Sequence, residues 1–150
     1  MQYVPRYFLI LLLFLSVSCK QNAKDSPELS SKTTSDELSS ISTENGGNLS
    51  PLEVKDLIRD NPDLIIIDVR TPQELKSGMV KKAINIDMYD QNFLLEIKKL
   101  KKDEKYLLYC AVGGRSSATS ELMKKEGFTS VFNSVKGFSS LKEAGITVKE

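Results

Sequence analysis

The chain has 150 residues, and its 21 lysines and arginines against 20 aspartates and glutamates give a formal net charge of +1. This length is enough for one modest domain, and the charge balance gives no basis for a nucleic-acid partner. The sequence contains no histidine, which excludes Ser-His and Cys-His catalysis and any histidine-containing metal site. Its two cysteines are too few for a cysteine-rich zinc site, so we expect no metal.

The first 18 residues predict a secretory signal peptide. Arg6 and the amino terminus are positive, residues 7–15 form an unbroken apolar run, and small residues follow. The run is too short to span a bilayer and is typical of a signal peptide. The stretch that ends at Cys19 resembles a bacterial lipoprotein signal, although Ser16 stands where that signal usually has leucine.

The lipoprotein resemblance implies that Cys19 is lipidated and becomes the mature amino terminus. We then expect a lipid-anchored protein of the bacterial cell envelope, with its domain outside the cytoplasm, in the periplasm or at the surface. The alternative is an ordinary signal peptide cleaved nearby, with Cys19 incidental. Residues 19–48 are polar and rich in serine and threonine, which predicts a disordered tether before a folded domain at 49–150.

Apolar periodicity and turn residues divide residues 49–150 into alternating helices and strands. The pattern Ser50-Pro51-Leu52-Glu53 is typical of a capped helix start, and Asn61-Pro62 ends that helix. The apolar run at 64–68 predicts a strand buried on both faces. Further elements are expected at 71–74 (start of a short helix), 83–86 (strand), 92–100 (helix), 106–109 (strand), 115–126 (helix), 131–133 (strand) and 138–144 (helix). This alternation predicts an α/β fold in which helices flank a parallel sheet.

The stretch at 107–116 carries the chain's most distinctive chemistry. An apolar strand leads to Cys110, a glycine-bearing loop follows, and Arg115 begins a helix whose apolar side we expect to include Ala118, Leu122 and Met123. A cysteine before a helix amino terminus meets unpaired N–H groups and the positive end of the helix dipole, which favour the nucleophilic thiolate. The alternative is a cysteine that serves as a small buried hydrophobe.

A second polar group follows the strand at 64–68. Because ligand sites of parallel sheets lie at the carboxyl ends of the strands, we expect Asp68 and Cys110 on one side of the sheet. Arg70 could pair with Asp68 or with Glu74 and fix the loop between them. We favour this supporting role for all three residues over direct catalysis.

Two motifs resemble those of rhodanese-like domains, a sulfurtransferase family. The first is Cys110-Ala111-Val112-Gly113-Gly114-Arg115-Ser116, which is similar to the family's active-site loop. The second is Asp68-Val69-Arg70-Thr71-Pro72-Gln73-Glu74-Leu75, followed by Gly78 and by Ala83-Ile84-Asn85-Ile86. The resemblance implies a rhodanese-like three-layer sandwich with a central parallel sheet of about five strands.

The resemblance also implies a reaction. The Cys110 thiolate would take a sulfane sulfur from thiosulfate or a thiol persulfide and pass it, through a Cys110 persulfide, to a thiol or cyanide. The amides of residues 111–116 would stabilise the anionic sulfur, and Arg115 would help to hold an anionic donor. No cofactor is needed. The partners would be a small sulfur donor and an external thiol acceptor, which a protein thiol could supply, and we expect a monomer.

Two other functions stay open. Cysteine phosphatases and arsenate reductases also combine a cysteine, an amide cradle and an arginine, but their loop usually holds one residue more than the four found here. A non-catalytic binding or redox-partner module is the other alternative, against which the presence of both Cys110 and Arg115 argues.

The sequence departs from the family pattern at several positions. Met79 stands where a histidine is common, Lys81-Lys82 replace a usual Pro-Gly, Lys136 replaces a glycine, and Leu141 replaces a common aromatic residue. These departures concern local packing more than chemistry. The apolar loop residues Ala111 and Val112 differ from the polar ones of many thiosulfate-using members, which makes a thiol persulfide or a protein partner a fair alternative donor.

Overall fold

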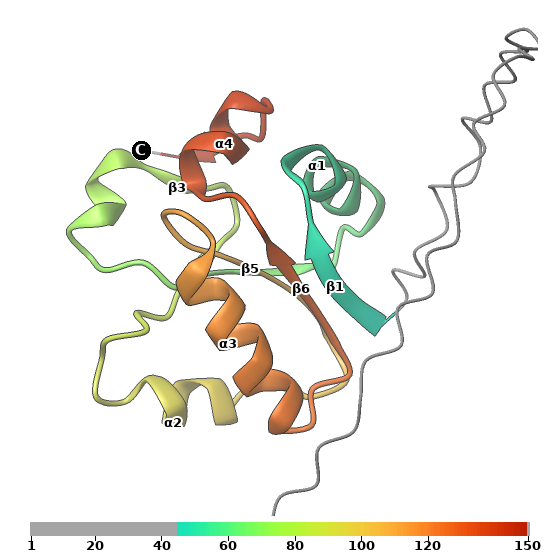
Figure 1. Ribbon diagram of the computed structural model, residues 1–150, viewed down its shortest axis with the longest axis vertical. Helices are drawn as coiled ribbons and strands as arrows, with labels where there is room; N and C mark the ends of the chain where they lie inside the picture. Colours follow the sequence, from blue (N-terminus) through green and yellow to red (C-terminus); the bar gives the residue numbers. More distant parts are fainter. Residues whose placement is uncertain (1–44, 150) are drawn as a thin grey trace, which may run out of the picture. The chain divides into compact units, whose positions relative to one another are not determined.

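Five strands form a sheet at the centre of the fold (Figure 1). The computed structural model describes residues 45–149, and the predicted signal peptide, Cys19 and most of the predicted tether lie outside this range. All neighbouring strands are parallel. Their spatial order is β1 (Gly46–Leu49), β6 (Ser130–Ser134), β5 (Lys105–Tyr109), β2 (Ile65–Asp68) and β4 (Ile84–Asn85). None of the helices in this part of the chain is long and apolar enough to cross a membrane.

Helices cover both faces of the sheet, as Figure 1 shows, and the expected three-layer α/β sandwich is confirmed. One face is covered by α1 (Pro51–Asp60) and α4 (Phe138–Glu143), and the other by α2 (Phe93–Lys98) and α3 (Gly114–Lys125). A 3₁₀ turn, η2 (Glu74–Ser77), follows β2, and the short strands β3 (Met79–Val80) and β7 (Val148–Lys149) form an antiparallel ribbon.

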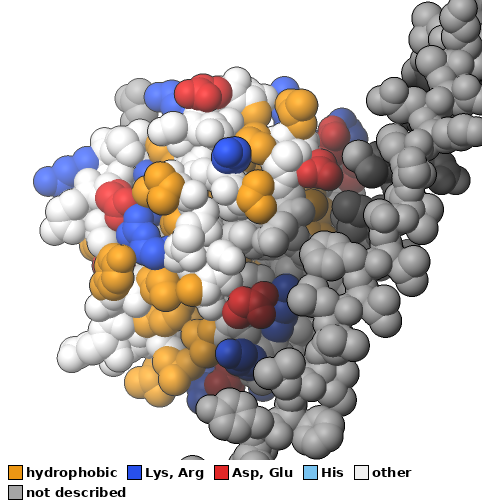
Figure 2. All heavy atoms as spheres, viewed as in Figure 1, with side chains coloured by type: hydrophobic (Ala, Val, Ile, Leu, Met, Phe, Trp, Pro, Cys, Tyr) orange, Lys and Arg blue, Asp and Glu red, His pale blue; other side chains and the backbone are white. Residues whose placement is uncertain are grey.

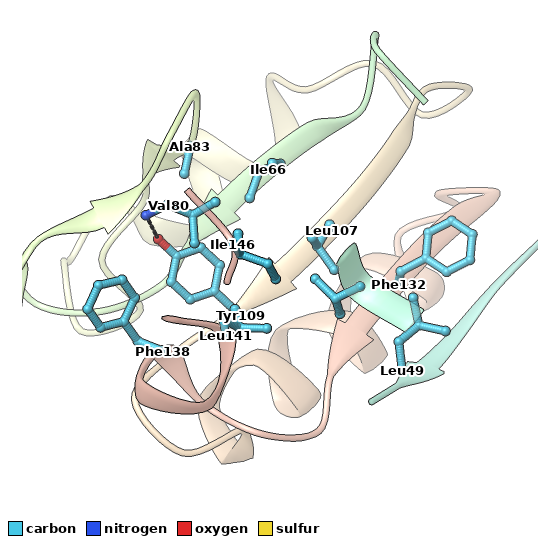
Figure 3. Close-up of a cluster of buried hydrophobic side chains, with 11 residues drawn as sticks. Leu49, Ile66, Val80, Ala83, Leu107, Tyr109, Phe132, Phe138, Leu141 and Ile146 are labelled. Atoms are coloured by element: carbon cyan, nitrogen blue, oxygen red, sulfur yellow. Dashed lines mark hydrogen bonds between the residues drawn. The ribbon is translucent and has the colours of Figure 1, made fainter. Parts of the chain in front are cut away.

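The strand β5 lies in the middle of the sheet and decides where Cys110 points. Successive residues of a strand face opposite sides, so Leu107 and Tyr109 belong to the core under α1 and α4, whereas Leu108 and Cys110 belong to the core under α2 and α3. The Tyr109 hydroxyl is anchored in its own layer, where it accepts a hydrogen bond of 3.0 Å from the Val80 N–H (Figure 3).

The buried face of α3 differs from the expected one. Ala118 is exposed and Leu122 only half-buried, whereas Met123 is buried beside three hydroxyl-bearing residues, Ser116, Thr119 and Ser120. Two of these hydroxyls donate to backbone carbonyls, Thr119 to Arg115 at 2.9 Å and Ser116 to Gly113 at 3.0 Å, which offsets the cost of their burial. The expected apolar side is therefore confirmed for Met123 and Leu122 and wrong for Ala118, and the helix also presents small polar side chains to the sheet.

The folded region begins earlier than the predicted boundary at residue 49. Strand β1 covers Gly46–Leu49 and pairs with β6 along its full length, with Gly46 opposite Val131. Gly46 has φ +99°, and a side chain there would meet the Val131 carbonyl oxygen at 2.2 Å. This strand was not predicted because its residues, Gly-Gly-Asn-Leu, have no strand-forming pattern.

The predicted start of α1 is confirmed and carries a stability prediction. The Ser50 hydroxyl accepts from the Glu53 N–H, and the Glu53 carboxylate accepts from the Ser50 N–H at 2.7 Å. Replacing Ser50 with alanine should lower the free energy of unfolding by about 1 kcal/mol, because an N–H of the first turn loses its acceptor. Urea unfolding of Ser50→Ala and of Ser117→Ala, an exposed position inside α3, tests this; equal losses would contradict the capping role.

Candidate functional site

Cys110 lies immediately after β5, where the strand gives way to the loop that enters α3. Its side chain has 0% exposed surface and packs against the apolar residues beneath α2 and α3. Its carbonyl accepts a 2.9 Å hydrogen bond from the Phe138 N–H, which ties the loop to the start of α4. The end of β5 and the start of α4 therefore both fix the position of Cys110.

The Cys110 sulfur is the focus of several hydrogen-bond donors. The Gly113 N–H lies 3.1 Å from Sγ, and the Ser116 hydroxyl lies 3.6 Å from it. Burial raises the pKa of Cys110, but hydrogen bonds from the backbone and hydroxyl of Ser116 and from the backbone of Val112 and Gly113 outweigh it, so the pKa lies below its ordinary value. Within the expected amide cradle at 111–116, the Gly113 N–H bonds to the sulfur, and together with the Ser116 hydroxyl it favours the thiolate.

Two glycines let the loop take this shape. Gly113 has φ +99°, and a Cβ there would lie 2.5 Å from the Val135 carbonyl oxygen. Gly137 approaches the loop from the other side, and a Cβ there would lie 1.4 Å from the Ala111 carbonyl oxygen. Gly114, in contrast, only begins α3 and has open space around it. The loop is therefore closed by backbone contact between residues 111–113 and 135–137.

The buried pair of Asp68 and Arg70 supports this edge of the sheet. Asp68 stands next to Tyr109 in the register of β2 and β5, which confirms that both motifs meet at one edge. Arg70 is 2% exposed, and its Nη2 donates to the Asp68 carboxylate at 2.7 Å and to the Gly78 carbonyl at 2.6 Å. Its guanidinium carbon lies 4.0 Å from the centre of the Phe138 ring. Of the two partners considered for Arg70, the structure selects the side chain of Asp68 and only the backbone carbonyl of Glu74.

The carboxylate of Glu74 instead binds Arg115. The two Nη atoms of Arg115 donate to the two carboxylate oxygens at 2.7 and 2.6 Å. Glu74 also accepts from the N–H and the hydroxyl of Thr71, both at 3.0 Å. The Arg115 hydrogen bonds, against some opposition from burial, lower the pKa of Glu74 to about 2, so the pair is ionised throughout the neutral range. The partners lie 41 residues apart, and no sequence spacing could have indicated the contact.

A cavity of about 430 Å³ opens beside this ion pair. It is lined by residues of η2, of the Cys110 loop and of α4, namely Arg70, Gln73, Glu74, Lys76, Ser77, Ala111, Phe138 and Ser139. It gives small molecules a space next to the loop that holds the sulfur. Between residues 45 and 149 the structure contains no group of three or more cysteine and acidic side chains that could hold a metal ion.

The loop surface around the sulfur is apolar. Val112 is 80% exposed, Tyr89 is 72% exposed with its ring 5.5 Å from the Arg115 guanidinium carbon, and Val135 is exposed on the segment that packs against Gly113. Figure 2 shows hydrophobic side chains on the face that carries α2 and α3, with basic and acidic side chains interspersed among them. A partner that meets this rim can therefore contact apolar side chains next to the Arg115–Glu74 ion pair.

The family model and a solved structure that resemble this chain both belong to rhodanese-like proteins. The model of the rhodanese-like domain family matches residues 50–144. A sulfurtransferase of Allochromatium vinosum is 28% identical over 51% of this chain and 69% of its own length. A tRNA uridine(34) hydroxylase of Cytophaga hutchinsonii is 34% identical over 58% of this chain, but the match spans only 28% of that protein. A crystal structure of a rhodanese-related protein from Thermoplasma volcanium superposes with a TM-score of 0.58, at 30% identity over 68% of this chain and 96% of that one.

The contact between Gly137 and Ala111 predicts a steric effect on the site. Alanine at position 137 would force the Cys110 loop away, because its Cβ overlaps a backbone oxygen that cannot rotate aside. We expect Gly137→Ala to lower the free energy of unfolding by about 3 kcal/mol, as for an overpacked core. Gly114→Ala is the matched control and should change it by less than about 0.5 kcal/mol. Denaturant unfolding measures the free energy of unfolding of the two variants. Similar losses in both would show that the loop can move aside at little cost.

The hydrogen bond from Ser116 predicts a shift in thiol reactivity. Ser116→Ala removes a donor to the sulfur, while the Gly113 carbonyl keeps the Ser117 N–H as a partner at 3.0 Å. The pKa of Cys110 should therefore rise, and the pH at which alkylation is half-maximal should move upward. The rate of iodoacetamide modification of the tryptic peptide 106–115, measured against pH, reports this value. Ser117→Ala, at an exposed neighbouring position, should leave the pH dependence of alkylation unchanged. If Ser116→Ala also leaves it unchanged, the Ser116 hydroxyl does not contribute to the low pKa of Cys110.

Proposed function

The chain belongs to the rhodanese-like domain family, and from this premise we propose that it is a sulfurtransferase that works through a persulfide on Cys110. One observation carries the proposal: the Cys110 sulfur lies at the carboxyl end of β5 under convergent N–H and hydroxyl donors that lower its pKa. A thiolate held in this way is a nucleophile that needs no general base. The sulfurtransferase from Allochromatium vinosum, related over most of its length, supports the same chemistry.

The first half-reaction loads the enzyme. The Cys110 thiolate attacks the outer, sulfane sulfur of the donor and forms a new S–S bond, while the donor's own bond to that sulfur breaks. The leaving group carries away the electron pair, as sulfite from thiosulfate or as a thiolate from a thiol persulfide. The negative charge then lies on the terminal sulfur of Cys110, close to the N–H groups of the loop, which stabilise an anion without reorganising.

The second half-reaction returns the enzyme to its starting state. A thiolate or cyanide attacks the terminal sulfur of the Cys110 persulfide, takes that sulfur and releases the Cys110 thiolate. Because the thiolate is itself stabilised by Gly113 and Ser116, it is a good leaving group. Sulfur transfer is thereby divided into two displacements at one atom, and the protein's contribution is a fixed set of hydrogen bonds.

The geometry of the loop favours sulfur over phosphorus as the reacting element. Four residues separate Cys110 from Arg115, and the Gly113 N–H reaches the thiolate itself at 3.1 Å. In addition, the Arg115 side chain binds Glu74, whereas a phosphatase would need it to bind the oxygens of a phosphoryl group. We therefore place sulfur transfer ahead of phosphatase or arsenate reductase activity.

The cellular setting that we propose comes from the amino-terminal sequence. Lipidation of Cys19 would anchor the domain to a membrane of the bacterial envelope, outside the cytoplasm. Cys110 would then be the only thiol of the mature protein, so the acceptor would be an external thiol, either small or on a protein. We also propose that the domain works as a monomer.

The proposal predicts a covalent intermediate. The 150-residue chain, incubated with thiosulfate or with glutathione persulfide and then alkylated, should yield peptide 106–115 with one additional sulfur atom. The Cys110→Ser variant should not gain this sulfur, and cyanide should remove it from the native protein. Mass spectrometry of the digest is the measurement. A chain that gains no sulfur from either donor is not a sulfurtransferase, and an aryl phosphate would then test the phosphatase alternative.

A further inference from the structure

Arg115 stands where a sulfurtransferase of this kind could hold an anionic donor. It is the second residue of α3, next to the loop amides, and its pKa is raised mainly by the hydrogen bonds with Glu74 and to a smaller extent by the negative charge of Cys110. A guanidinium here could bind two oxygens of an oxyanion with two parallel hydrogen bonds. In the structure both of its Nη atoms already donate to Glu74, and only 17% of its side chain is exposed.

From this arrangement we infer that Glu74 is a positioning residue that sets the donor specificity: by occupying Arg115 it directs the enzyme to thiol persulfides and against the dianion thiosulfate. The inference rests on the proposed sulfurtransferase function. Glu74 acts through Arg115 and need not touch the reacting sulfur.

Glu74 is well held for this role. The Thr71 N–H and hydroxyl bind the same carboxylate oxygen that receives one Arg115 nitrogen, so the carboxylate stays in place without the arginine. With its pKa near 2 the group is ionised at any pH at which the enzyme would work, and the pair has no net charge. An incoming dianion thus meets a neutral unit, and it must displace a carboxylate with two short hydrogen bonds to reach the guanidinium.

The rest of the site offers little to replace that cation. Of the residues that line the adjoining cavity, Arg70 is buried and bound to Asp68, and Lys76 is an exposed side chain at the edge. The rim beside the loop carries exposed Val112, Val135 and Tyr89 together with one exposed lysine, Lys136. A dianion would give up hydration here in exchange for the exposed lysines Lys76 and Lys136, and exposed charge pairs contribute little to binding. A thiol persulfide carries one charge at most and brings an organic group that the apolar rim can contact.

The same chemistry operates on both donors, so only their binding should differ. With thiosulfate, the thiolate takes the outer sulfur and sulfite leaves with the electrons of the broken S–S bond. With a persulfide, the thiolate takes the terminal sulfur and the organic thiolate leaves. A change that frees Arg115 should therefore act on the KM for thiosulfate and leave the chemical step unaltered.

The Glu74→Gln variant tests this inference. Glutamine has the same shape and can keep the Thr71 contacts, but it leaves Arg115 with a full positive charge. In the 150-residue chain we expect the KM for thiosulfate to fall about tenfold, as an uncompensated charge near a dianion would produce. The kcat for thiosulfate and both constants for glutathione persulfide should stay within about twofold, a change too small to indicate altered binding. Glu121→Gln, which breaks an exposed ion pair with Lys124 on α3, is the matched control and should behave as the native protein.

Two further measurements make the outcome decisive. In Glu74→Gln/Arg115→Met the gain for thiosulfate should vanish, since the freed cation is gone. In the native protein, sulfate, another dianion, should not compete with glutathione persulfide; strong competition would overturn the inference even if Glu74→Gln did not fold. A thiosulfate KM that is unchanged or raised in a folded Glu74→Gln protein would also overturn it. If the native protein transfers sulfur from neither donor, the proposed function fails first, and the inference fails with it.

Discussion

Everything at the site depends on how the Cys110 sulfur can be buried and still carry a negative charge. An isolated thiolate in an apolar layer would be unstable, and burial alone raises the pKa of Cys110. The loop reverses this because its backbone curls around the sulfur, with Gly113 in a left-handed conformation and α3 beginning at the next residue. The curl is in turn held by Gly137, whose missing side chain admits the Ala111 carbonyl. The negative charge on Cys110 therefore depends on the shape of the loop, and the shape of the loop depends on the connection between β6 and α4.

Two arginines serve different ends although both are paired with acids. Arg70 is buried, binds Asp68 within its own loop and reaches the Gly78 carbonyl, so it stabilises the chain between β2 and β3. Asn85 reinforces the same loop, since its amide donates to the carbonyls of Asp68 and Arg70 at 2.9 and 2.8 Å. Arg115 lies nearer the surface and joins α3 to η2 through Glu74, which lines the cavity. The first pair fixes geometry, whereas the second also decides how much charge the site presents.

Local signals in the sequence predicted the fold well, and contacts between distant segments were not predicted. The capping box at Ser50, the apolar run before Asp68 and the strand ending at Tyr109 each depend on a few neighbouring residues, and each was confirmed. Strand β1 has no such signal, because its Gly-Gly-Asn-Leu residues become a strand only through pairing with β6. The ion pair between Glu74 and Arg115 likewise exists only once the sheet brings η2 and α3 together.

The departures from the family pattern show which features the fold can lose. Leu141 fills the core beneath α4 with no exposed surface, so an aromatic residue is not required there. Lys82 adopts φ +67°, a left-handed conformation that glycine would take at little cost, and the turn before β4 forms nonetheless. Lys136 is exposed next to Gly137, which alone makes the close approach to the loop. Each of these substitutions falls where packing tolerates it, whereas a side chain at Gly113 or Gly137 would overlap the backbone of Val135 or Ala111.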